Sequence, residues 1–519
     1  MVLDTGAEPM DRRRVLESLS GLFLALFVAL LGSTVVSVAL PRIIGSLNGT
    51  QTQYTWVVTA TLLTATATTP VWGKLSDLFN KKTTVQAAIV IFVVGSLISG
   101  FSQNTPQLIA ARAFQGIGIG GLQALAQVVM AAIIPPRERG KYNGYLGAVT
   151  ATATVGGPLL GGLIVDVPWL GWRWCFFIGV PIAAIAFAVL QRTLKLPTVR
   201  RPDAQVDYLG ASLIAIGVSV LLIWVSFVGN TFDWLSWQTA AMVGGGLVVL
   251  ALAVLVENRV REPIVPLRLV VMRTPALAIL ASLAVGMAMY GGSVFLGQYF
   301  QVGRGYTPTE AGLLTMPMML GVLVSSTVAG RLISRSGKLK PFIVTGASVL
   351  VVGFLGLAMI DHDTSLVLIG IAMAIVGIGV GMTMQNLVLA VQNSVALRDL
   401  GAASASVTFF RSLGGTVGVS VLGAVLANRV TADLATALHT PAGASTGEVS
   451  ALNLQALPPA VRQTVQMVYG DATAHIFLIS AVVGVVGIIA ALLLKPITLR
   501  TTIDVEKKEE PAVADPVAG

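Results

Sequence analysis

Two arginines, Arg112 and Arg411, lie inside long stretches of the chain that carry no other charge. A guanidinium within a membrane-spanning helix costs roughly 2.5 to 3.5 kcal/mol even on a lenient insertion scale, so each should face a cavity or a partner. The alternative for Arg112 is a helix-end side chain that reaches the outer interface. For Arg411 the alternative is a structural role, reaching toward the inner end of its helix. Both are candidate intramembrane charges.

Acidic residues are missing from the middle of every apolar stretch. Those nearest to the expected outer ends of the stretches are Asp166, Glu310 and Asp471. Proton coupling through a carboxylate at the membrane midplane is therefore not expected. Three routes stay open: coupling through an acid at a helix end, Glu310 or Asp166; coupling through His475, whose imidazole titrates in a useful range; or no proton coupling.

Other reactive patterns are sparse. Cys175 is the only cysteine, which excludes an internal disulfide, and His362, His439 and His475 do not have the spacing of metal ligands. No Gly-Lys-Ser or Gly-Lys-Thr phosphate-binding loop occurs, so ATP is not the expected energy source. We therefore expect no cofactor, no metal site, no nucleic-acid partner and no enzymatic activity.

The elements that position these residues are apolar helices. Of 519 residues, 55% are hydrophobic and 11% are charged, against about 25% charged in an ordinary globular chain, and the mean hydropathy is +0.83. Apolar runs of about 20 residues, the length needed to cross a bilayer, recur fourteen times. Each should be a helix, because the bilayer core offers backbone groups no water. The predicted fold class is an all-α integral membrane protein.

Positive charge predicts how these spans are oriented. With both termini in the cytoplasm, the inside segments hold 26 of the 33 lysines and arginines and the outside loops hold five. The positive-inside rule then favours an even number of spans in a cell (plasma) membrane, with short basic loops against anionic lipid. This distribution explains the net charge of +9 without nucleic acid.

The chain contains an internal repeat with an offset of 261 residues. Gly116-Ile-Gly-Ile-Gly120 resembles Gly377-Ile-Gly-Val-Gly381, and the same offset relates Gly140 to Gly401; Gly73 and Gly330 are related by 257 residues. Such duplication is typical of alternating-access transporters. The predicted organisation is a cytoplasmic N-terminus at 1–18, a six-helix bundle at 19–206, two inserted helices at 207–260, a six-helix bundle at 261–500 and a disordered cytoplasmic tail at 501–519. Within the second bundle, 427–471 is expected to be an outside loop with two short helical patterns.

Several motifs resemble one family in order and spacing. Gly73-Lys-Leu-Ser-Asp-Leu-Phe-Asn-Lys-Lys82 is similar to the loop 2-3 signature of the major facilitator superfamily, and Leu108-Ile-Ala-Ala-Arg-Ala-Phe-Gln-Gly-Ile-Gly118 to its fourth-helix motif. Gly156-Gly-Pro-Leu-Leu-Gly-Gly162 resembles the fifth-helix motif of exporters. Segments 172–181 and 410–418 are similar to those of the fourteen-span drug:proton antiporter branch. The resemblance covers nearly all of the chain.

The resemblance implies a function, and one residue of this sequence differs from the family pattern. It implies secondary active export of lipophilic or amphipathic small molecules by alternating access, driven by the proton gradient, in a major facilitator fold of two six-helix bundles plus two inserted helices. The alternative is an exporter or flippase of endogenous lipid or cell-envelope metabolites. Gly32 occupies the first-helix position that usually holds Asp in this branch. Without that acid, neutral or zwitterionic lipophilic cargo is favoured, and the partners are such a substrate, membrane lipids and possible protons.

The resemblance also implies roles for particular residues. Asp77 would face the positive N-terminus of span 13 near 402–404 and latch the two halves together at the inside, with Gly73, Lys81 and Lys82 supporting it. Gly156, Gly157, Pro158, Gly161 and Gly162 would let span 5 bend or slide against its neighbour in the other half. Spans 1, 4, 9 and 12 would surround the substrate cavity, and their candidate lining residues are Ser33, Thr34, Ser37, Gln115, Gln123, Tyr290, Gln298, Tyr299, Gln301, Gln385 and Asn386.

Overall fold

The computed structural model describes residues 12–47, 51–167, 170–194, 207–228, 232–260, 263, 271–396, 399–437, 459–496 and 498–499. Regular structure in these residues is helical, and the β-type pairings found there are two isolated bridges. The first half consists of α1 (Arg12–Ser46), α2 (Gln51–Leu78), α3 (Lys81–Phe101), α4 (Thr105–Ile133), α5 (Pro136–Asp166), α6 (Trp174–Phe177) and α7 (Gly179–Thr193).

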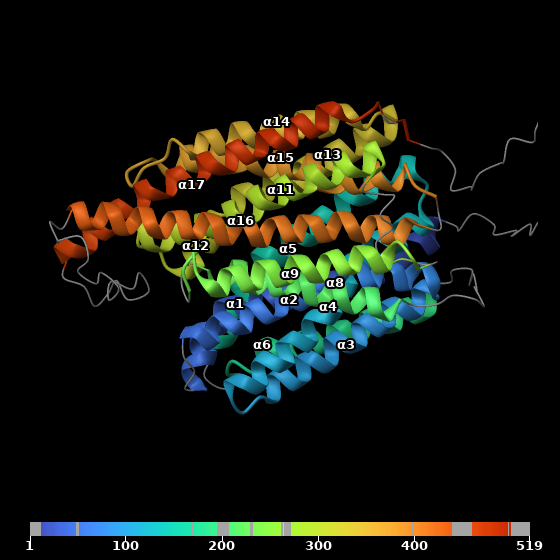
Figure 1. Ribbon diagram of the computed structural model, residues 1–519, viewed down its shortest axis with the longest axis horizontal. Helices are drawn as coiled ribbons and strands as arrows, with labels where there is room; N and C mark the ends of the chain where they lie inside the picture. Colours follow the sequence, from blue (N-terminus) through green and yellow to red (C-terminus); the bar gives the residue numbers. More distant parts are fainter. Residues whose placement is uncertain are drawn as a thin grey trace, which may run out of the picture.

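Two helices connect the halves, α8 (Tyr208–Phe227) and α9 (Trp237–Glu257). The second half consists of α11 (Arg273–Gln298), the π-helical turn η1 (Tyr299–Gly303), α12 (Pro308–Leu314), α13 (Met316–Ser336), α14 (Lys340–Leu357), α15 (Leu366–Gln392), α16 (Leu400–Ala437) and α17 (Pro459–Leu493). The long helices run roughly parallel to one another along the longest dimension of the molecule (Figure 1).

Eleven helices of the described part are long and apolar enough to cross a membrane. The helices α2 and α5 fall outside that set because α2 is rich in threonine and α5 begins with the polar sequence Pro-Arg-Glu-Arg-Gly-Lys, while the apolar part of α8, Leu209–Val225, is shorter. Each packs lengthwise against one of the eleven: α2 on α4, α5 on α1 and α8 on α9. The described helices thus comprise eleven candidate spans and three further long helices packed against them, arranged as two six-helix bundles with two additional helices.

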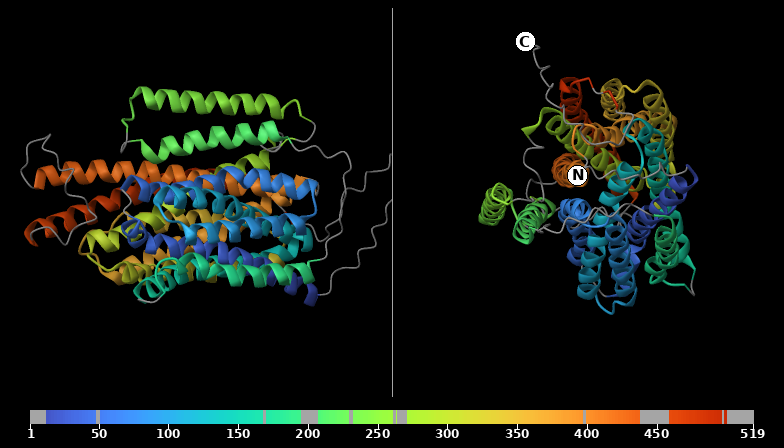
Figure 2. Two further views of the ribbon diagram at one scale, coloured as in Figure 1. Left: turned by 90° about the horizontal axis from the view of Figure 1, so that it is seen from below. Right: turned by 90° about the vertical axis from the view of Figure 1, so that its right-hand side faces the viewer.

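The additional helices α8 and α9 lie beside the bundles rather than within them (Figure 2, green pair). They contact each other closely at Gly217 and Gly246, where an added Cβ would meet leucine side chains of the opposite helix. The helix α8 also packs against α2 and α16, one from each half. Large apolar side chains of α9, such as Leu247, Val248 and Leu252, remain exposed, as expected for a helix that faces lipid.

The helices α16 and α17 extend beyond the predicted spans. The former continues to Ala437 and the latter begins at Pro459, so the two short helical patterns expected in the outside loop are continuous with these helices. Alanine and leucine in 427–437 favour helix, and no glycine or proline interrupts it. Residues 438–458 of that loop lie outside the described residues.

The buried core consists of separate clusters in the two halves, and each main cluster includes one residue from the other half. Ala405 of α16 packs in the cluster of the first half, and Ala131 of α4 packs in that of the second. Both alanines are fully buried. The two bundles therefore meet through small side chains, in an interface formed mainly by α2 with α16 and α5 with α13.

Candidate transport site and the seal between the halves

One end of the bundle carries the basic loops between α2 and α3, α4 and α5, and α13 and α14, together with the start of α1 and the end of α17 (right side of Figure 1). We name it the basic end. At this end the carboxylate of Asp77 accepts hydrogen bonds from the backbone N–H groups of Gly401, at 3.0 Å, and Ala402, at 2.9 Å. These are the first residues of α16, where free N–H groups and the helix dipole favour an anion.

Glycine makes this approach possible. A Cβ at Gly73 would lie 2.7 Å from the carbonyl oxygen of Gly401 and would overlap the Cβ of Ala405. Of the two lysines expected to support Asp77, Lys81 interacts electrostatically with it, and Lys81 Nζ donates to the carbonyl of Ser76 at 3.1 Å. Lys82 Nζ donates to the carbonyl of Gln191 at 2.6 Å. Lys82 therefore ties the start of α3 to the end of α7.

A second contact between the halves lies at the crossing of α5 and α13. A Cβ at Gly140 would be 2.6 Å from the carbonyl oxygen of Gly330, and one at Gly330 would be 2.6 Å from the carbonyl carbon of Gly140. The repeat offsets relate Gly73 to Gly330 and Gly401 to Gly140, so the two glycine crossings are pseudo-symmetric copies. The side chains at the two crossings form different hydrogen bonds. Asp77 at the first crossing corresponds to Ser334 at the second, and the Ser334 hydroxyl has no hydrogen-bond partner among the described residues.

Between these crossings, buried polar side chains join the halves. Gln127 of α4 donates to Gln385 of α15 across the interface. Within the second half, Gln392 Nε2 donates to Ser404 Oγ of α16 at 3.0 Å. Arg139 is fully buried and donates to Gln392 Oε1 at 3.2 Å. Its other nitrogens donate to the carbonyls of Ala131 and Ile134, at the C-terminal end of α4, where the helix dipole favours a cation. We call Asp77, Gln127, Arg139, Gln385, Gln392, Ser404 and the two glycine crossings the seal.

The role of Arg139 and Gln392 in this network was missed in the sequence. Arg139 looks like one of three basic residues in a cytoplasmic loop, where a positive charge normally indicates orientation only. Gln392 ends a long apolar run and carries no motif. A weak signal exists in that Arg139 directly precedes Gly140, which belongs to the repeat. The contact itself depends on how the halves dock.

Arg112 is buried inside the first half. Its Nη1 donates to Gln115 Oε1, and Gln115 Nε2 donates to Ser96 Oγ of α3 at 2.6 Å. The ring of Phe176 lies 5.9 Å from the guanidinium. A Cβ at Gly95 would be 2.6 Å from the Cα of Gln115, so α3 and α4 touch here. Arg112 therefore does not extend to the outer surface, and Gln115 faces α3 rather than a space between the halves.

The glycine motif of α5 packs on α1 of the same half. An added Cβ at Gly157 would overlap Thr34, and one at Gly161 would be 2.7 Å from the carbonyl oxygen of Val35; Gly156 is loosely packed. Thr34 Oγ1 donates to the carbonyl of Ala153 at 3.0 Å. The beginning of α5, around Gly140, touches the other half, and α5 also packs along α13 and against α12 of that half. The surroundings of Pro158 and Gly162 lie outside the described residues, although α5 is continuous through both.

This contact makes a first prediction. Gly157→Ala is expected to slow transport about tenfold, because even one added methyl group overlaps Thr34 and overpacking costs about 1–3 kcal/mol. Combining it with Thr34→Gly removes the overlapping atoms and should restore more than half of the lost rate, whereas Gly156→Ala, at the loosely packed neighbour, should have little effect. Efflux rates of the four proteins at equal expression provide the measurement. A double variant as slow as the single one contradicts this explanation.

The remaining candidate lining residues fall into two groups. Several are engaged within their own half: Asn386 donates to the carbonyl of Met382, Tyr299 OH donates to that of Asp361 at 2.7 Å, and Gln298 accepts from Tyr469 OH at 2.7 Å. Ser37, Tyr290 and Gln301 are exposed, and Ser33 and Gln123 are half-buried. The second group supplies polar groups that are accessible in this state.

The three candidate proton carriers lie away from the seal. Glu310 is exposed and forms a capping box on α12, accepting from Thr307 N and Thr307 Oγ1, both at 2.8 Å. His475 is exposed on α17. Asp166 ends α5, and its side chain lies outside the described part of the chain.

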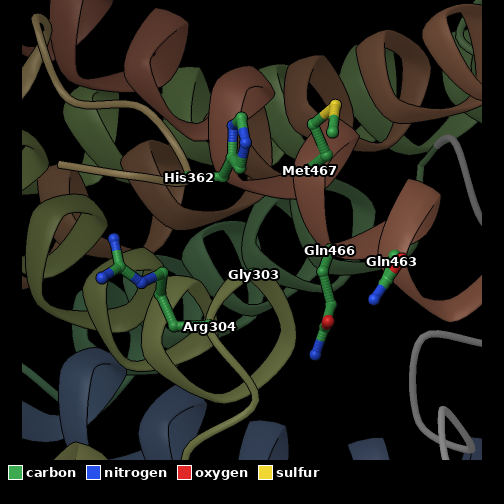
Figure 3. Close-up of a pocket in the computed structure, with 6 residues that line it drawn as sticks. All are labelled: Gly303, Arg304, His362, Gln463, Gln466 and Met467. Carbon is green, nitrogen blue, oxygen red and sulfur yellow. The ribbon is translucent and has the colours of Figure 1, made fainter.

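A cavity of about 300 Å³ lies at the end opposite to the seal, between η1, the start of α17 and the loop that follows α14 (Figure 3). His362 in that loop contacts Asp471 of α17 at 3.1 Å, and Arg304 donates to the carbonyl of Thr364 at 2.9 Å. Hydrogen bonds from Thr364 and from a backbone N–H lower the pKa of Asp361, beside His362. The lining residues are Gly303, Arg304, His362, Gln463, Gln466 and Met467.

The duplicated helical halves, the polar contacts between them and the added helix pair define a polytopic membrane transporter. The family model described as Major Facilitator Superfamily matches residues 22–419, and the chain belongs to that family. Members of this family are transporters rather than enzymes.

Similar proteins include an uncharacterized MFS-type transporter of Mycobacterium tuberculosis, 37% identical over 92% of this chain and 69% of that protein. The multidrug transporter protein MdtP of Bacillus subtilis is 36% identical over 79% of this chain and 74% of that protein. Among solved structures, the proton:xylose symporter XylE has the same fold, with a TM-score of 0.62 at 13% identity over 93% of this chain and 96% of that one.

Proposed function

We propose that the protein exports lipophilic or amphipathic small molecules across the plasma membrane by alternating access. The observation that supports this most is the seal, in which Asp77, Gln127 and Arg139 of one half contact α16 and α15 of the other. Buried polar contacts between rigid bundles are suited to separating and reforming as units. Relatives named multidrug transporter protein MdtP and Multidrug resistance protein 3 support an export role.

The orientation of the seal gives this proposal a direction. The positive-inside distribution of lysine and arginine favours placing the basic end, and both termini, in the cytoplasm. The described state is then closed toward the cytoplasm. Release of substrate to the outside belongs to such a state, and loading from the cytoplasm or the inner leaflet requires the seal to open.

We further propose that the proton gradient drives export. Glu310 is held in a helix cap and His475 lies on an exposed helix face, so we assign neither as the proton-carrying residue. The test therefore varies the pH gradient rather than a residue. In everted vesicles that are acid inside, exchange of one proton for one neutral substrate should increase accumulation about tenfold per pH unit. The neutral dye Nile red is a suitable probe, and vesicles without the protein provide its background.

Collapse of the gradient by a protonophore should return accumulation to the level of vesicles at equal pH. Equal accumulation with and without the gradient contradicts proton antiport while leaving export in place. Export of an endogenous lipid or envelope metabolite is separated from drug export by a deletion strain: drug sensitivity with unchanged envelope lipids supports the proposal, and the reverse result supports lipid export.

A further inference from the structure

Arg411 is the one buried arginine of the described chain for which the structure shows no hydrogen-bond or ion-pair partner. The residue is 6% exposed, and its Nε and Nη1 atoms are inaccessible to solvent and unbonded. The other buried arginines differ, since Arg112 donates to Gln115, and Arg139 to Gln392 and to carbonyls at the end of α4. A buried cation without a partner is costly, because the surrounding apolar groups do not replace its hydration.

Among the described residues, the structure shows no ion pair between Arg411 and an acid. Along the chain the acids nearest to Arg411 are Asp399, just before α16, and Asp433 within it, about 18 Å and 33 Å away at ~1.5 Å per residue. The sequence has no Asp or Glu between Glu262 and Glu310, a range that includes α11, or between Asp363 and Asp399, a range that includes α15. Arg411 lies eleven residues after Leu400, about 16 Å along α16, in an apolar stretch without another charge.

The neighbouring helix α11 adds two hydroxyl groups on the face that meets Arg411. The helices touch at Gly286, where a Cβ would lie 3.0 Å from Arg411 Cγ. Ser282 and Tyr290 are one turn before and one turn after Gly286, so they share its face. The Ser282 hydroxyl is buried and has no hydrogen-bond partner in the described residues. The Tyr290 ring lies against Gly415 of α16, one turn after Arg411, and is 37% exposed.

We propose that Arg411, with the hydroxyls of Ser282 and Tyr290, binds the anionic group of an amphipathic substrate. A guanidinium pairs with a carboxylate or sulfonate through two parallel N–H donors, and both hydroxyls can donate to the same oxygens. The exposed aromatic ring of Tyr290 provides an apolar wall for the rest of the molecule. This inference rests on the proposed export function, and it changes the expected cargo from neutral or zwitterionic molecules to organic anions and zwitterions.

The test uses full-length protein in nanodiscs of zwitterionic lipid and two fluorescent probes, dansylaminoundecanoic acid and its methyl ester, in which one methyl group replaces the negative charge. The wild-type protein is expected to bind the acid about tenfold more tightly than the ester, since a charge-assisted hydrogen bond contributes about that factor. Arg411→Gln should weaken binding of the acid about tenfold and leave the ester unchanged. Arg411→Lys keeps the charge and should retain part of the preference.

Arg429→Gln is the matched control, because Arg429 is an exposed arginine of the same helix that already pairs with Asp433; both probes should bind to it as to wild type. Ser282→Ala keeps the arginine and should weaken acid binding a few-fold. Equal wild-type affinity for acid and ester, no binding of either probe, or an equal loss of both in Arg411→Gln overturns the proposal. If the protein exports the ester but binds the acid no more tightly than the ester, the anion-binding site is contradicted and the export function is not. If the protein binds the acid more tightly but exports neither probe, the export function is contradicted and the anion-binding site is not.

Discussion

Gly330→Val is expected to lower transport roughly a hundredfold, the largest effect of any single substitution that we predict. At this position the backbones of α13 and α5 touch, and a Cβ would overlap the carbonyl group of Gly140. Neither backbone can yield as a flexible side chain would, so the overpacking cost should lie near the upper part of the usual 1–3 kcal/mol range. A valine here should keep the halves apart at the basic end and so block the state described above.

Labelling of a buried cysteine measures this directly. Ala131 is fully buried in the interface between the halves, so Ala131→Cys in a Cys175→Ala background should react slowly with a maleimide added at the basic end. Gly330→Val should accelerate that reaction and abolish efflux together. Gly245→Val is the control, since a Cβ at Gly245 of α9 meets open space. If Gly330→Val retained wild-type efflux, the close contact of α5 and α13 at this position would not be required for transport.

Asp77→Asn is expected to open the seal without adding any bulk. Two carboxylate oxygens accept from two N–H groups at the start of α16, whereas an asparagine offers one oxygen and turns an N–H donor toward the other. The lost charge-assisted hydrogen bond and the lost interaction with the helix dipole together cost about 2–3 kcal/mol. The population of the open state should therefore rise about 30- to 150-fold.

The same Ala131→Cys reporter should react faster in Asp77→Asn, and efflux should fall about tenfold or more. Asp233→Asn, at an exposed acid before α9, removes an equal charge away from the interface and should leave both measurements unchanged. Unchanged cysteine reactivity in Asp77→Asn would show that the carboxylate does not hold the halves together.

The family and the helical architecture follow from features that depend on local sequence. Long uncharged runs, the bias of basic residues and the glycine offsets each act within one helix or loop, and they correctly predict a membrane protein of the major facilitator type. The site next to α16 at which Asp77 binds also corresponds to the region that the motif indicates. These features tolerate errors of a few residues at helix ends.

The contacts between elements are harder to predict because side-chain direction decides them. Gln115 shares a helix with Gln127, yet one faces α3 and the other reaches α15. The glycine motif of α5 suggests contact with the other half, but Gly157 and Gly161 face Thr34 and Val35 of α1. Arg139 resembles any loop arginine until α4, α5 and α15 enclose it. A rotation of one residue, about 100° on a helix, separates these outcomes.

The two glycine crossings are copies in backbone but not in strength. On one side a carboxylate caps α16 from within the interface; on the other, the exposed guanidinium of Arg137 reaches carbonyls of Ser334 and Arg335 at 3.3 and 3.4 Å. Exposed polar contacts contribute little. Beside the buried hydrogen bond from Arg139 to Gln392, the described residues at the α5–α13 crossing supply these exposed contacts and no carboxylate cap, so we expect this crossing to separate at lower cost than the α2–α16 crossing.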